Sequence, residues 1–132
     1  MFLLNYVKQL NKLYMQFRTR KLVKPEDLNP GGSLFGGQLL RWIDEEAAIY
    51  AMCQLNNQRV TTKFMSEIDF ISPARTGDVI EIGLEMVQIG TTSITFRCEA
   101  RVKQTEKTII TIDKIVFVNL DDKLRPTPHN KG

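Results

Sequence analysis

The sequence is poor in histidine. Its 132 residues contain one, His129, which lies in a polar C-terminal segment. This disfavours a serine or cysteine nucleophile activated by histidine, and it disfavours a histidine-rich metal site. Any chemistry must therefore depend on carboxylates, amides and backbone groups, and we expect neither a metal nor another cofactor.

Cysteine is almost as rare. The two cysteines, Cys53 and Cys98, are too far apart in the sequence for a close-spaced metal or redox motif. One pair is also a poor disulfide framework. We interpret both as buried free thiols of a protein in the reducing cytoplasm.

The chain also lacks a long hydrophobic run and a strong charge imbalance. Residues 1–14 are apolar but interrupted by Asn and Lys, so they fit a short amphipathic helix better than a membrane span. They also fit a signal peptide badly, and we regard them as an N-terminal extension without assigned function. The formal net charge of +3 gives little support to a nucleic-acid partner and suits an anionic small molecule equally well.

What is present is enough for one domain with a packed core, since 42% of the residues are hydrophobic. Short connections between the last four predicted strands indicate antiparallel neighbours. We expect an α+β domain over residues 15–126 and a disordered tail over 127–132. The predicted strands cover residues 15–23, 60–70, 79–89, 94–102 and 108–120.

A loop and a helix over residues 29–53 form the centre of the predicted domain. Pro30 and the glycines after it keep the first part irregular, and the residues after Gly37 predict four to five helical turns. Apolar residues occupy nearly every side of this helix, which predicts that it is buried. A strongly curved antiparallel sheet could wrap most of it, and a homodimer partner is the simplest cover for the rest.

An acidic triplet, Asp44-Glu45-Glu46, interrupts the apolar helix. Successive helical residues point about 100° apart, so at least one of these carboxylates faces inward or toward an interface. A carboxylate there is costly unless it is paired, and functional sites are enriched in such acids. The triplet is therefore the clearest indication of chemistry in the chain.

Four motifs in this order and spacing resemble the acyl-CoA thioester hydrolases of the hot-dog fold, in which a curved antiparallel sheet wraps one long helix. The resemblance covers about residues 15–126, and it departs from many relatives at Glu45, Glu46 and residues 30–33. The motifs are Asn29 with Leu34-Phe35-Gly36-Gly37, Leu40 through Ala48 with its Asp44, Phe70-Ile71-Ser72-Pro73-Ala74 before Gly77-Asp78-Val79, and Gly90-Thr91-Thr92-Ser93.

This resemblance implies hydrolysis of acyl-CoA to free CoA and a carboxylic acid, in a homodimer that assembles into a trimer of dimers. Asp44 would be the general base or the nucleophile, and Asn29 of the other subunit would position water or substrate. The amides near Phe35, Gly36 and Gly37 would meet the carbonyl oxygen at the positive end of the helix dipole. Gly37 and Asp44 lie about 11 Å apart along the helix axis, which also favours a shared site.

CoA carries phosphates, so basic side chains at the rim are expected. Arg59, Lys63 and Arg75 are candidates, although each fits a plain surface charge as well. The loop of Gly90, Thr91, Thr92 and Ser93 resembles the family loop beside the pantetheine or nucleotide, and its alternative is a hairpin turn.

The catalytic assignments have structural alternatives too. Asp44 could be an acid buried in an interface, Asn29 a turn residue before Pro30, and Gly36 and Gly37 a site of close packing. A protein that binds acyl-CoA without turnover and a dehydratase-like hot-dog enzyme are the rival functions. The dehydratases normally use a histidine, and the only one here lies in the tail.

Overall fold

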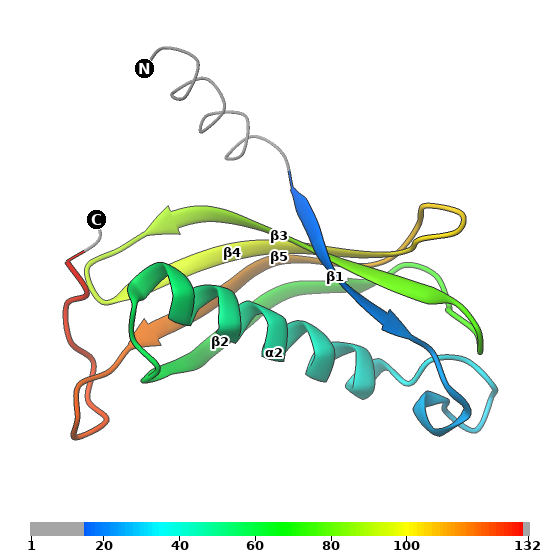
Figure 1. Ribbon diagram of the computed structural model, residues 1–132, viewed down its shortest axis with the longest axis horizontal. Helices are drawn as coiled ribbons and strands as arrows, with labels where there is room; N and C mark the ends of the chain where they lie inside the picture. The colour runs from blue at the N-terminus through cyan, green and yellow to red at the C-terminus, as the bar shows by residue number, and fades with distance from the viewer. Residues whose placement is uncertain (1–14, 131–132) are drawn as a thin grey trace, which may run out of the picture.

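The computed structural model describes residues 15–130, so the predicted N-terminal extension and residues 131–132 lie outside the described part of the chain. Five strands and one long helix make up the domain, as Figure 1 shows. The elements are β1 (Gln16–Leu22), η1 (Pro25–Asp27), α2 (Gly36–Leu55), β2 (Val60–Phe70), β3 (Val79–Ile89), β4 (Ser93–Val102) and β5 (Lys107–Asn119).

The strands form one sheet in the order β1-β3-β4-β5-β2, and every neighbouring pair is antiparallel. The sheet curves, and α2 lies along one face of it (Figure 1). The expected α+β architecture, a curved antiparallel sheet around one long helix, is therefore confirmed. It leaves β1 and β2 as the two edges of the sheet.

One predicted pairing is wrong, because β2 and β3 are not neighbours. The loop over residues 71–78 carries the chain to the other side of the sheet and places β2 next to β5. Backbone hydrogen bonds hold this loop in place. The Leu34 N–H donates to the Ala74 carbonyl at 2.8 Å, and the Val23 N–H donates to the Asp78 carbonyl at 2.9 Å.

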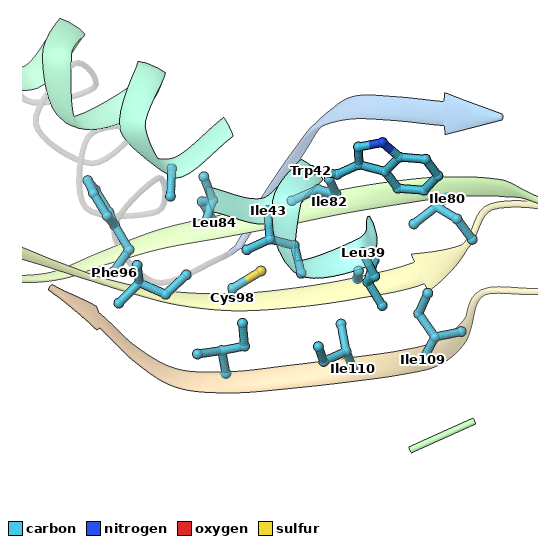
Figure 2. Packing of buried hydrophobic residues seen from close by; sticks show 14 of the residues in the cluster. Leu39, Trp42, Ile43, Ile80, Ile82, Leu84, Phe96, Cys98, Ile109 and Ile110 are labelled. Atoms are coloured by element: carbon cyan, nitrogen blue, oxygen red, sulfur yellow. The ribbon is translucent and has the colours of Figure 1, made fainter. Parts of the chain in front are cut away.

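The core lies between α2 and the concave face of the sheet. Helix residues spaced three or four apart, among them Leu39 and Ile43, pack against alternate residues of β3, β4 and β5 (Figure 2). Each fully buried side chain of this size stabilises the fold by about 1.5–3 kcal/mol. Trp42 is buried in this core, and the Tyr50 ring packs edge to face on Phe96 at 4.9 Å between centroids.

Within one chain α2 is not buried all round, which corrects the prediction from its composition. The sheet covers one side of the helix only. Ile49 is 54% exposed, although it is a large apolar residue. We call the outward side the outer stripe of α2; its exposed residues recur every fourth position at Gly37, Arg41, Glu45, Ile49 and Cys53.

The two cysteines differ in exposure, because Cys53 lies on the outer stripe of α2 and Cys98 lies on the buried face of β4. Cys98 is a buried free thiol, as predicted, and Cys53 is a free thiol too but is exposed. Burial and, to a smaller extent, the nearby carboxylate of Glu99 together raise the pKa of Cys98 to about 12. Thiolates are the reactive form of cysteine, so the two thiols should differ strongly in reactivity.

We expect a thiol reagent to label native protein at one residue, Cys53. Cys98 should react only after unfolding, because its thiol is inaccessible and stays protonated at neutral pH. Counting labels by mass spectrometry in native and denaturing buffer checks this. Cys53→Ser is the matched control and should abolish native labelling, whereas two labels on the native wild type would contradict the burial of Cys98.

The predicted disordered tail is wrong for residues 127–130. The Thr127 N–H donates to the Asn119 carbonyl at 2.9 Å, and Asn119 returns a side-chain hydrogen bond to the Thr127 carbonyl at 3.1 Å. His129 is buried, and its Nε2 lies 2.9 Å from the Ser93 carbonyl oxygen. Backbone pairing of the tail with β5 and the β3–β4 turn thus outweighs its polar composition.

Candidate active site

Asp44 lies on the flank of α2 that faces β2. It is half-buried, and its Oδ1 accepts a hydrogen bond of 2.7 Å from the Thr62 hydroxyl. An ionised carboxylate has no proton to donate, so this hydroxyl must direct its proton at Asp44. Glu45, the next residue, points outward and pairs with Arg41 at 3.2 Å. The structure thereby separates the acids of the triplet.

Thr62 is a site residue that the sequence did not indicate. It lies on β2, where a bulge between Thr62 and Phe64 shifts the register against β5. Its contact with Asp44 spans 18 positions and depends on how α2 packs on β2. The sequence pattern predicts both elements but not their mutual placement, so nothing in it pairs these two residues.

Asn29 is held in a tight loop ahead of α2. Its Oδ1 accepts from the Ser33 N–H at 3.1 Å, and its Nδ2 donates to the Ser33 hydroxyl at 3.2 Å. Within one chain these contacts match the turn interpretation of Asn29. An amide nitrogen carries two protons, so the Asn29 side chain can still donate one more hydrogen bond.

The start of α2 leaves backbone donors unpaired. Its N-cap is Phe35, which has no side-chain acceptor for the first amides of the helix. Among residues 15–130, the N–H groups of Gly36 and Gly37 have no hydrogen-bond partner. They point out of the positive end of a 20-residue helix, so a ligand oxygen is a suitable acceptor for them.

A buried carboxylate fixes the Asn29 loop to the start of the helix. Asp27 is 3% exposed and accepts from the Lys24 N–H and from the Gln38 side chain, both at 2.9 Å. The Phe35 N–H in turn donates to the Asp27 carbonyl at 2.8 Å. The sequence pattern around Asp27 predicts only a turn that ends the first strand, so it does not indicate this role.

Asn29 and Gly36 meet in a pocket of about 390 Å³, which we call the α2 N-terminal pocket. It lies between the loop before α2, the first turn of α2 and the loop that follows β2. Gly36 is needed here for close packing as well, because a Cβ on it would lie 3.1 Å from the Phe70 ring. The lining residues are Asn29, Leu34, Gly36, Leu39, Phe70, Ile71, Ser72, Pro73, Ala74 and Ile109.

The candidate CoA residues lie at the two ends of the domain. Lys63 and Thr92 line one cavity of about 540 Å³, and the Arg59 carbonyl accepts from the Leu120 N–H at the same end. Arg75 lies in the loop after β2, beside the α2 N-terminal pocket, where its N–H donates to the Asp78 carboxylate at 2.9 Å. Arg59 and Lys63 thus lie at the start of β2, and Arg75 lies in the loop that follows the end of β2.

The segment from Gly90 to Ser93 forms the turn between β3 and β4, which matches its hairpin interpretation. The Gly90 N–H donates to the Ser93 carbonyl at 2.9 Å. His129 and the Thr91 carbonyl, which accepts from the His129 N–H at 3.1 Å, join the tail to this turn. The single histidine therefore supports the β3–β4 turn and is not part of the α2 N-terminal pocket.

Glu81 is a second buried acid, but it lies outside this site. It stands on the face of β3 turned away from the core, between Arg20 at 3.2 Å and Arg101 at 3.0 Å. Burial raises its pKa, but the hydrogen bonds and charges of both arginines outweigh burial and lower the pKa overall. Arg101 also stacks on the Phe17 ring at 3.8 Å, so this cluster ties the edge strand β1 to β3 and β4.

Residues 15–130 contain no group of three or more His, Cys, Asp or Glu side chains that could hold a metal ion. No helix in this range has the length and apolar character needed to cross a membrane.

Known proteins resemble this chain over most of its length. The family model described as thioesterase superfamily matches residues 31–109. Acyl-CoA thioester hydrolase YciA of Salmonella typhimurium is 34% identical over 117 residues, which are 83% of this chain and 87% of that protein. YciA of Escherichia coli is 33% identical over 117 residues, 83% of this chain and 88% of that protein.

Solved structures agree with this family. A hexameric thioesterase from Yersinia pestis matches with a TM-score of 0.83 and 28% identity, over 90% of this chain and 98% of that one. An acyl-CoA hydrolase from Staphylococcus aureus, in complex with butyryl coenzyme A, coenzyme A and coenzyme A disulfide, matches with a TM-score of 0.74 and 32% identity. That match covers 83% of this chain and 66% of the other. The chain belongs to the thioesterase superfamily, and its fold is that of the hot-dog members its motifs resemble.

Proposed function

We propose that the protein hydrolyses acyl-CoA thioesters to free CoA and a carboxylic acid at a site shared by two copies of the chain. The observation that carries this is the pairing of a half-buried Asp44 with the Thr62 hydroxyl, on a helix whose first amides are unpaired. The names of the relatives support the substrate class, since they are acyl-CoA thioester hydrolases.

Edge strand β2 supports a two-fold dimer. It carries exposed apolar side chains at Phe64, Ile68 and Phe70, and an uncovered apolar edge readily pairs with another strand. Pairing of two β2 strands about a two-fold axis is antiparallel, so the Phe70 end of one copy meets the Val60 end of the other. This arrangement brings the Thr62 end of one copy, and with it Asp44, toward the α2 N-terminal pocket of its partner.

A site shared by two copies also accounts for the separation between Asp44 and the glycine amides within one chain. Asp44 follows Gly36 by eight positions on α2, which is about 12 Å along the helix axis. One chain therefore cannot place its own Asp44 and its own glycine amides on the same carbonyl group. In the dimer, Asp44 of one copy would face Asn29 and the glycine amides of the other.

The proposed chemistry follows from these positions. Asp44 takes a proton from water, whose oxygen attacks the thioester carbonyl, or attacks that carbonyl directly. Charge then develops on the carbonyl oxygen and is stabilised by the N–H groups of Gly36 and Gly37. The C–S bond breaks and CoA leaves as the thiolate. In the first route the thiolate takes the proton that Asp44 removed from water, and the water oxygen is already part of the acid. In the second route the acyl group is left as a mixed anhydride with Asp44, and water then hydrolyses it to release the acid and free Asp44. Asn29 positions the water or the substrate with its remaining amide proton.

The same dimer would bring the candidate CoA-binding side chains Arg59, Lys63 and Arg75 close together. Arg75 of one copy would approach Arg59 and Lys63 of the other, because these residues flank opposite ends of β2. Together with the β3–β4 turn they would bind the phosphates of CoA, for which guanidinium and ammonium groups are good donors. The formal net charge of +3 favours the approach of such an anion.

We further propose a trimer of dimers in the cytoplasm that works without metal. Support for the assembly comes from relatives described as hexameric thioesterases. The two free thiols suit a reducing compartment.

Release of thiol tests the reaction. The protein is incubated with acyl-CoA esters from two to sixteen carbons and a thiol-reactive chromophore, in a Cys53→Ser background so that the exposed thiol does not contribute colour. We expect colour with at least one chain length. Binding of acyl-CoA without colour for any chain length would instead identify a protein that binds these esters without turnover.

A further inference from the structure

Two hydrogen bonds to one residue, Asp27, enclose the glycine pair at the start of α2. The Phe35 N–H, just before the pair, donates to the Asp27 carbonyl at 2.8 Å. The Gln38 side chain, just after the pair, donates through Nε2 to the Asp27 carboxylate at 2.9 Å. Gly36 and Gly37 are thus held on both sides by the same residue, which ends the short turn between β1 and α2 (Figure 1).

Asp27 is itself firmly held. Its N–H donates to the Lys24 carbonyl, and its second carboxylate oxygen accepts from the Lys24 N–H, both at 2.9 Å. The ion pairs of residues 15–130 do not include Asp27, so its buried carboxylate depends on these amide donors. Buried acids of this kind are enriched in functional sites.

The glycine pair needs such an attachment. Glycine has more backbone freedom than any other residue, and the N-cap Phe35 has no side-chain acceptor that could fix the first turn of α2. Amides that stabilise a developing charge must point at the oxygen that carries it, and a misplacement of about 1 Å can cost on the order of a hundredfold in rate.

Resting on the proposed function, we infer that Asp27 is a positioning residue, which orients the Gly36 and Gly37 amides toward the thioester carbonyl. It acts through its hydrogen bonds to Phe35 and Gln38. Full charge develops on the carbonyl oxygen only during the reaction, so poorly oriented amides should lower kcat far more than they raise KM.

Gln38→Met tests the side-chain contact. Methionine is unbranched, favours helices as glutamine does and cannot donate to Asp27. We expect a folded protein in which kcat for thiol release falls by about tenfold or more, with KM little changed. The matched control is Glu26→Gln, which changes the exposed acid next to Asp27 in the same turn and should keep wild-type kcat.

An exchange of partners separates orientation from general damage to the loop. Gln38→Glu alone sets a second carboxylate against Asp27 and should impair kcat at least as strongly as Gln38→Met. Adding Asp27→Asn should restore most of kcat, because the new amide can donate to the new carboxylate while its oxygen still accepts from the Lys24 N–H. A folded double variant that stays as slow as Gln38→Glu overturns the inference, also where Gln38→Met does not fold.

Two analogues that cannot be hydrolysed give a readout without turnover. One replaces the thioester sulfur by a methylene and keeps the carbonyl, and the other keeps the sulfur and replaces the carbonyl by a methylene. By calorimetry, wild-type protein should bind the carbonyl compound about fivefold more tightly, which is the effect of one hydrogen bond. In Gln38→Met this preference should disappear, while affinity for the compound without the carbonyl stays at the wild-type value.

The outcomes keep the inference apart from the proposed reaction. A wild type without the preference, a folded Gln38→Met that retains both the preference and kcat, or an equal loss of affinity for both analogues in Gln38→Met overturns the inference. If wild-type protein never releases thiol, the proposed reaction is wrong. A preference that is present in the wild type and lost in Gln38→Met then still supports the orientation of the glycine amides by Asp27.

Discussion

Asp44→Asn is expected to lower kcat for acyl-CoA hydrolysis by about a thousandfold, within the range that a lost general base costs. Asparagine has the same shape, and its amide oxygen can still accept the Thr62 hydrogen bond of 2.7 Å. It cannot take a proton from water or attack a carbonyl. The loss should therefore appear in kcat, with KM changed much less, in steady-state assays of thiol release.

The matched control is Glu45→Gln. Glu45 is the neighbouring acid on the same helix, but it is exposed and pairs with Arg41 on the outer stripe of α2. An exposed pair of this kind contributes little to stability, so activity and melting temperature should stay close to wild type. If Asp44→Asn keeps more than a tenth of wild-type kcat, or if Glu45→Gln is equally impaired, Asp44 is not the catalytic carboxylate.

The strands illustrate what the sequence could predict. In β4 the apolar residues alternate with polar ones, and the structure buries Phe96 and Cys98 while Arg97 between them is exposed. Such alternation is a local property of a pleated strand, so it can be read without knowledge of neighbours. The predicted bounds of β2 and β3 also match the structure to the residue.

The partners of the strands could not be predicted in the same way. β2 is followed in sequence by β3 but pairs with β5, and its apolar residues Phe64, Ile68 and Phe70 remain exposed. Alternation shows which residues share a face of a strand, whereas pairing depends on the path of loops such as residues 71–78. The placement of Thr62 beside Asp44 depends on that path, so the sequence alone does not pair these two residues.

Composition alone gave wrong predictions for the order of the C-terminal tail and for the burial of Cys53. The residues after Pro126 are polar and short of hydrophobics, yet Thr127 pairs with Asn119 and His129 is buried against the β3–β4 turn. Cys53 belongs to an apolar helix, yet it is exposed because the sheet covers only one side of that helix. In both cases the outcome depends on what lies next to the segment in space, which a sequence pattern does not contain.

For the acidic triplet, helix geometry alone predicted the different surroundings of its residues correctly. A turn of 100° per residue requires that Asp44, Glu45 and Glu46 face different surroundings. The structure agrees, since Asp44 contacts β2 and Glu45 points away from the sheet. The role of Asn29 stays a prediction, because its contacts with Ser33 within one chain fit a turn as well as a site.

Mixing two inactive variants is expected to restore activity if two copies share the site. Asn29→Ala and Asp44→Asn should each be nearly inactive as pure proteins. When they are unfolded together in equal amounts and refolded, about half of the dimers contain one chain of each kind. One of the two sites in such a dimer then has both Asn29 and Asp44, so the mixture should regain about one quarter of wild-type activity.

The geometry of one chain gives the opposite expectation. If each site used Asp44 and Asn29 of the same subunit, every site in the mixture would lack one of them and activity would stay at the level of the single variants. A refolded mixture of Asp44→Asn with the double variant is the control, because no arrangement of these chains restores a complete site. Different affinity tags on the two variants establish that mixed dimers form. Mixed dimers without regained activity would contradict the shared site and with it the antiparallel pairing of β2 strands, since that pairing is what brings Asp44 of one copy to the unpaired amides of the other.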